Sequence, residues 1–171
     1  IIGVAIQYHE GSNREIPGRT GFAHLFEHML FQESQHVGQD QFFKKIQNVG
    51  GTLNGGTNKD GTVYYEIIPK NALETVLWME SDRMGHMLGA ITQERLDEQR
   101  GVVQNEKRQG DNQPYGMVEY HILEGIFPSS HPYSWSTIGS MADLDAASLD
   151  DVHAWFKKYY GPNNAVIVIA G

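Results

Sequence analysis

The spacing of apolar residues along the chain predicts a mixture of strands and helices. Residues 2–8 have the composition of a strand, and the closing stretch "NNAVIVIAG" predicts another one. Over residues 20–32 the apolar positions instead recur every three or four residues, which predicts a helix with one buried face. That face carries Phe22, Leu25, Phe26, Met29 and Leu30.

Cap and turn residues divide the rest of the chain into further elements. Asp40 and Thr92 are expected to cap helices singly, and two pairs resemble capping boxes, Asn71 with Glu74 and Ser148 with Asp151. The expected helices run over about 40–49, 71–88, 92–109, 117–126 and 148–160. Two strands are expected on either side of a turn at 58–61, and the second of them covers 62–68. The segment 127–140 is expected to be irregular.

Hairpin-type strands interspersed with helices favour an α+β fold over a doubly wound parallel sheet. We therefore expect a mixed or antiparallel sheet packed with helices, in a single domain over residues 1–171. Both ends fall inside strand patterns, so the chain is expected to be a fragment of a longer protein.

Composition removes several classes of function. The net charge is −8 and no basic cluster is present, which argues against nucleic acid as a partner. The chain has no cysteine, so disulfides, thiolate metal sites and a cysteine nucleophile are excluded. No apolar run is long enough for a membrane span.

The polar side of the helix over 20–32 carries the candidate chemistry. His24, Glu27 and His28 fall within about 100° of its circumference. Histidines at i and i+4 can both bind one small cation, and Glu27 beside them can act as a general base toward a metal-bound water. The order His-x-x-Glu-His is the inverted zinc-peptidase motif. Two histidines on a helix can also be merely packed or hydrogen-bonded.

A zinc site for hydrolysis usually has three protein ligands, so a third must come from elsewhere in the chain. In the helix over 92–109, Val102 and Val103 are expected to face the core, and Glu106 lies on the same face. A carboxylate turned inward needs a partner, which a zinc ion would supply. Glu106 is therefore the preferred third ligand and Glu98 the alternative.

Five blocks cover most of the chain: "GSNREIPGRTGFAHLFEHMLF", "GGTLNGGTNKDGTVYYEIIP", "LWMESDRM", "RGVVQNEKRQGDNQPYG" and "HPYSWSTIGSMADLDAASLDDVHAWFKKYYGPNNAVIVIAG". In this order they resemble the amino-terminal catalytic domain of the pitrilysin/insulinase family of zinc metallopeptidases, which includes the mitochondrial processing peptidase. The resemblance implies a mitochondrial processing peptidase-like fold, Zn²⁺ bound by His24, His28 and Glu106, and Glu27 as general base of a zinc-dependent endopeptidase.

The resemblance also implies how substrate binds. A peptide would add as a strand to an exposed edge over 53–57, with Asn54, Gly55 and Gly56 as substrate-binding residues. A carboxy-terminal half or a second subunit would complete the chamber around extended or unfolded peptides. Where relatives have a supporting glutamate seven residues before the ligand, this chain has Gln99, with Glu98 adjacent, and such outer residues affect activity.

Two alternatives belong to other classes of protein. A non-catalytic family member would act as a structural or partner-binding subunit, but such relatives typically lose parts of the His-Glu-His set, which is intact here. S-ribosylhomocysteine lyases share the motif order but need a cysteine, which this chain lacks. A bacterial, periplasmic location rests on the family resemblance alone.

Overall fold

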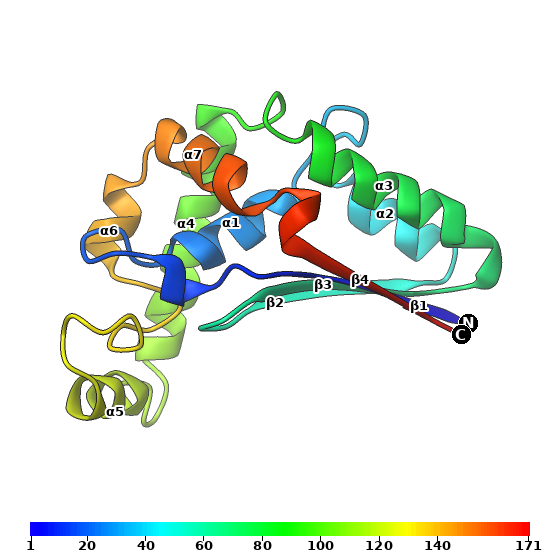
Figure 1. Ribbon diagram of the computed structural model, residues 1–171. Coiled ribbons are helices and arrows are strands. Elements are labelled where there is room, and N and C mark those ends of the chain that lie inside the picture. Colours follow the sequence, from blue (N-terminus) through cyan, green and yellow to red (C-terminus); the bar gives the residue numbers. More distant parts are fainter.

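A four-stranded sheet with helices packed mainly on one face forms the frame of the molecule, in a computed structural model that describes residues 1–171 (Figure 1). The strand order is β2-β3-β1-β4, and all three pairings are antiparallel. The α+β prediction is therefore confirmed, with an antiparallel sheet. The strands are β1 (Ile2–Tyr8), β2 (Thr52–Thr57), β3 (Thr62–Ile68) and β4 (Ala165–Ala170).

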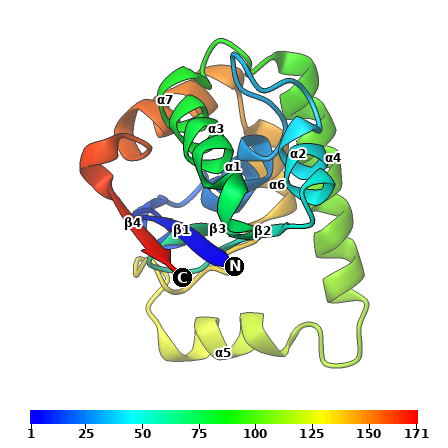
Figure 2. The same cartoon turned by 90° about the vertical axis from the view of Figure 1, so that its right-hand side faces the viewer.

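Seven α-helices connect these strands, and α1, α2, α3 and α7 lie over the same face of the sheet while α5 lies on its other side (Figures 1 and 2). The helices are α1 (Phe22–Leu30), α2 (Gln41–Asn48), α3 (Leu73–His86), α4 (Gln93–Asp111), α5 (Val118–Ile126), α6 (Met141–Ala146) and α7 (Leu149–Tyr159). No helix combines the length and the apolar character that a membrane crossing requires.

Some predicted helix starts are confirmed and others are wrong. Thr92 accepts a hydrogen bond from the Arg95 amide, and Ser148 forms a full capping box with Asp151. Asp40 has a φ of 61°, so its left-handed backbone directs the side chain away from the cap role. Asn71 lies in a short 3-10 turn, and α3 begins after it without a side-chain cap.

Helix α6 was not predicted from the sequence. Its N-cap Ser140 accepts a hydrogen bond from the Asp143 amide, which is the ordinary Ser-x-x-Asp start signal. Asp143 in turn accepts from the amide and the hydroxyl of Thr20, at 2.9 and 2.6 Å. The short helix therefore fastens the chain just before α1.

The core has two clusters of buried apolar side chains. The larger one joins α1, α4 and α7 to the sheet, and the smaller one lies under α2 and α3. Helix α1 is the most enclosed element, since seven of its nine residues are buried. The polar side of so short a buried helix must be satisfied by neighbouring elements rather than by solvent.

Arg83 of α3 is buried beside Phe31, the residue that follows α1. It is 1% exposed, it pairs with Glu80, and its guanidinium lies 4.2 Å from the centre of the Tyr64 ring. Glu66 lies farther away, with its Oε1 atom 3.9 Å from the guanidinium, and burial together with the neighbouring Glu80 charge raises the pKa of Glu66 to about 9. The pair of Arg83 and Glu80 supports the wall of the site described below.

Replacing Arg83 with Met should destabilise the fold by roughly 3–5 kcal/mol, because Glu80 would remain buried without its partner. Equilibrium unfolding in urea measures the change. Arg108, which is exposed and bonds only Asn105, provides the matched control, and Arg108→Met should change stability by less than about 0.5 kcal/mol. Equal effects of the two substitutions would contradict the role given to the buried pair.

Candidate metal centre

The polar side of α1 faces α4, and there three side chains converge. The Nε2 atoms of His24 and His28 lie 3.2 Å apart, and the Glu106 Oε2 atom lies 3.6 and 3.4 Å from them. No other group of three potential metal ligands is found in the structure. The i, i+4 spacing brings the histidines together, and the packing of α1 against α4 brings in the carboxylate.

These distances fit a bound zinc ion. Ligand atoms at about 2.0–2.1 Å from a tetrahedral ion are about 3.3 Å from one another, and the three observed separations lie close to that value. Burial, with a smaller contribution from the charge of His28, lowers the pKa of His24 to about 4. His24 is therefore neutral at pH 7, as a metal ligand must be.

Glu106 is less buried than the sequence predicts. The spacing along α4 predicts that Val102 and Val103 share a buried face with Glu106. Val103 is fully buried, but Val102 is 38% exposed and the Glu106 side chain is 43% exposed. Burial alone therefore does not require a partner for Glu106, and its proximity to the histidine rings is the more direct evidence.

The other two candidates on α4 lie outside the cluster. Glu98 bonds Arg95 at 3.0 Å, and Arg95 also bonds Glu33 in the loop after α1, so Glu98 is held away from the histidines. Gln99 is 5% exposed but forms no hydrogen bond with His24, His28 or Glu106. The Nδ1 atom of His24 is buried and has no partner, so the expected support from Gln99 is absent.

Glu27 lies between the two histidines in sequence and contacts β2. The Thr57 hydroxyl donates to Glu27 Oε2 at 2.5 Å. Burial raises the pKa of Glu27 above its ordinary value, while hydrogen bonds from the Thr57 hydroxyl and amide act in the opposite direction. Glu27 is thus held in place by the Thr57 hydroxyl, which the sequence pattern did not indicate.

Strand β2 is an edge strand, since its only neighbour is β3. The amide of Gly55 donates to the Asn54 side chain, so it does not face β3. In an antiparallel pair, successive residues direct their backbone N–H and C=O groups to opposite sides of the strand. The backbone groups of Leu53, Gly55 and Thr57 therefore point to the open edge. This free edge ends at Glu27.

The two glycines of β2 have different surroundings. A Cβ atom on Gly55 would lie 2.9 Å from the Phe31 ring, so glycine is needed there to let that ring pack against the strand. A Cβ on Gly56 would meet nothing within 4 Å. Close approach of a substrate can therefore be argued for Gly56, whereas the role of Gly55 lies in the packing of the site.

A surface cavity of about 360 Å³ opens over the cluster. Beside His24, His28 and Glu106 it exposes the aromatic rings of Phe31 and Phe43, whose centres are 5.3 Å apart. The cavity is completed by Glu27, Gln32 and Asn54. A group bound there would have polar ligands on one side and an apolar wall on the other.

The three converging side chains form a candidate metal centre on an α+β frame, and comparison with known proteins identifies the family. Residues 2–134 match the model of the family described as insulinase, peptidase family M16. The chain belongs to this peptidase family.

Individual relatives are similar over nearly the whole chain. It is 30% identical to the zinc protease PqqE of Helicobacter pylori over 171 residues, and 27% identical to the mitochondrial-processing peptidase subunit beta of Blastocladiella emersonii over 175. The crystal structure of a protease from Helicobacter pylori superposes with a TM-score of 0.93 at 30% identity, over 99% of this chain and 40% of that one. These two matches span 100% and 98% of this chain but only 38% and 36% of the relatives, so the chain corresponds to less than half the length of either.

If Glu27 acts as the general base, Thr57→Val should lower kcat by roughly 10–100-fold with little change in KM, because the Glu27 carboxylate would lose the hydrogen-bond donor that orients it. Thr57→Ser retains the hydroxyl and should restore most of the activity. Steady-state kinetics of the full-length protein, with zinc content measured in parallel, test this. A serine variant as slow as the valine variant would show that the hydroxyl is not what matters.

Proposed function

We propose that this chain is the catalytic amino-terminal part of a zinc-dependent endopeptidase, with His24, His28 and Glu106 holding the metal. The observation that carries the proposal is the set of three ligand-atom separations close to a tetrahedral edge, next to a buried carboxylate. Membership of the M16 family and the zinc proteases among its relatives support the choice of metal and reaction.

In this proposal Glu27 moves the proton. Zinc held by the three ligands would polarise the scissile carbonyl and acidify a water molecule. Glu27 accepts the proton of the attacking water and afterwards donates it to the leaving amine. Its raised pKa suits both directions of transfer, and the hydrogen bond from the Thr57 hydroxyl fixes the carboxylate while it acts.

The substrate would bind as an added strand on β2. The backbone groups of Leu53 and Gly55 face the open edge, and that edge leads to Glu27. Asn54 lines the cavity and can contact the peptide, while Phe31 and Phe43 offer an apolar wall to one of its side chains. Backbone pairing does not depend on sequence, so extended or unfolded peptides are the proposed substrates.

A carboxy-terminal half or a second subunit of the same family would complete the binding chamber. The chain covers less than half of its curated relatives, one of which is a subunit by name. The outer face of the sheet is also apolar and open, with Tyr65, Ile67, Val166 and Val168 between 39% and 63% exposed. Such a surface is typical of a face that another part of the protein covers.

The alternative of a non-catalytic subunit makes different use of the same fold. In that case zinc binding and cleavage would both be absent, although the three ligands and the base are present in this chain. The paired substitutions described next separate the two possibilities.

Glu27→Gln should retain zinc but lower cleavage of an unstructured peptide by about 10²–10⁴-fold, since it removes the base and no ligand. Glu106→Gln should instead weaken zinc binding sharply. Metal analysis and a peptide-cleavage assay on the full-length protein distinguish the two effects. Near-normal turnover of the Glu27 variant, or full zinc occupancy in a His24→Ala, Glu106→Gln double variant, would refute these roles.

Peptides with single N-methylated amides test the added strand. If the peptide pairs with β2, N-methylation should weaken binding at every second position, because alternate amides face the strand. Each sensitive position should cost about 1 kcal/mol, or roughly fivefold in KM. The unaffected positions between them serve as internal controls, and a profile without a period of two would argue against strand addition.

A further inference from the structure

The N-cap residue of helix α1 has no side chain that could cap the helix. The residue at that position is Gly21, with a φ of 87°, and no side chain within the helix accepts a hydrogen bond from the first turn. A Cβ on Gly21 would lie 2.6 Å from the Ile138 carbonyl oxygen, so a capping residue such as serine or aspartate cannot be accommodated there. The first amides of the helix therefore need an acceptor from elsewhere.

Glu15 supplies that acceptor from the preceding loop. Its Oε2 atom accepts from the Gly21 amide at 3.1 Å, and its Oε1 atom accepts from the Ala23 amide at 2.9 Å. The carboxyl group is 4% exposed, and it also accepts from the Trp135 indole at 3.1 Å. Burial raises the pKa of Glu15 to about 8, while the hydrogen bonds from the two amides and the indole act in the opposite direction. The helix dipole adds to these bonds in favouring the carboxylate form.

One of the two amides that Glu15 binds lies next to a proposed metal ligand. Ala23 is adjacent to His24, so the amide that Glu15 holds belongs to the residue before the first proposed ligand. Helix α1 is only nine residues long, and its ligands occupy positions 3 and 7 of it. A small tilt or shift of its first turn would move the two histidines relative to Glu106, which lies on a separate helix.

We propose that Glu15 is a positioning residue of the metal centre, which fixes the direction of α1 by capping its N-terminus across the loop and so sets the distance between the histidines and Glu106. This inference rests on the proposed zinc site. Glu15 itself touches none of the three ligands.

Glu15→Gln is the sharpest substitution. All three partners of Glu15 are N–H donors, and a glutamine amide of the same shape would direct its own N–H₂ group at one of them. In the full-length protein the variant should bind zinc roughly 10–100-fold more weakly, the range for residues that orient metal ligands. The visible absorption spectrum of the Co²⁺-substituted protein should also change, because it reports ligand geometry.

Glu10 provides a matched control. It is likewise a fully buried glutamate that accepts from an indole, Trp155 at 2.8 Å, and from Tyr160 at 3.1 Å, but both partners lie at α7 and none on α1. Glu10→Gln should lower the thermal stability while leaving the zinc affinity and the Co²⁺ spectrum close to those of the wild type. An equal loss of affinity in both variants would show a general effect of destabilisation and would overturn the proposal.

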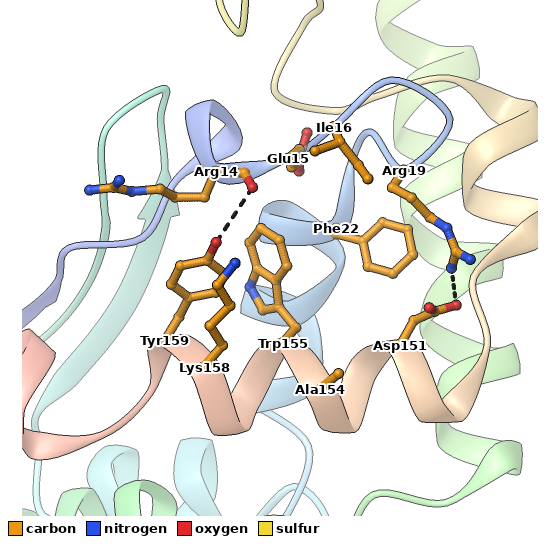
Figure 3. A pocket seen from close by; sticks show the side chains of 10 residues that line it. All are labelled: Arg14, Glu15, Ile16, Arg19, Phe22, Asp151, Ala154, Trp155, Lys158 and Tyr159. Atoms are coloured by element: carbon orange, nitrogen blue, oxygen red, sulfur yellow. Dashed lines mark hydrogen bonds and ion pairs between the residues drawn. The ribbon is translucent and has the colours of Figure 1, made fainter.

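A second variant covers the case in which Glu15→Gln does not fold. Glu15 lines a surface pocket of about 340 Å³ between its own loop and α7, near Phe22 at the start of α1 (Figure 3). A small carboxylate can therefore reach the space left by Glu15→Ala. Added acetate should restore folding and zinc affinity of that variant, whereas neutral acetamide should not. No rescue, or equal rescue by both, would contradict the proposal.

Zinc binding by the wild-type protein and the role of Glu15 are tested by different measurements, so either one can fail alone. If the wild-type protein binds no zinc, the proposed function fails. If the wild type binds zinc and Glu15→Gln binds it equally well with the same Co²⁺ spectrum, the function stands and the positioning role of Glu15 is wrong.

Discussion

The burial of α1 is the constraint on which the rest of the structure depends. The helix is short and lies between the sheet, α4 and α7, so its apolar face fixes its rotation. Once Leu25, Phe26 and Met29 are in the core, His24 and His28 must face α4 and Glu27 must face β2. The chemistry of the site follows from the packing of one helix.

A buried helix of nine residues cannot hold its own position, and the chain fastens it at both ends. Glu15 holds the first turn, and Asp143 holds Thr20 just before it. After the helix, Asp82 of α3 accepts from the Ser34 hydroxyl at 2.5 Å, and Arg95 of α4 bonds Glu33. The charged groups around α1 thus act mainly on its placement, and the site depends on contacts made well outside it.

The sequence predicted those parts of the site that are local in the chain. The i, i+4 histidines and Glu27 follow from helical spacing alone, and Glu106 was chosen from the faces of a second helix. Glu15 and Thr57 could not be found in this way, because each contacts α1 from a different segment of the chain. The spacing of residues within one helix or strand does not predict such tertiary contacts. The Ser140 start of α6, in contrast, carried a readable signal.

The wrong expectations share a physical cause. Asp40 has the residue type of a cap but a left-handed backbone and no side-chain cap bond. Val102 has the residue type of a core position but is more than one third exposed. Gln99 is buried on α4 but forms no hydrogen bond with His24, His28 or Glu106. In each case the residue type indicated a role, and the tertiary environment determined whether it was filled.

Diffraction from crystals of the full-length protein at the zinc absorption edge tests the central claim most directly. The account predicts one strong anomalous peak within about 2.0–2.1 Å of His24 Nε2, His28 Nε2 and a Glu106 carboxylate oxygen. A peak ligated by other side chains, or no peak in protein crystallised with zinc, would contradict it.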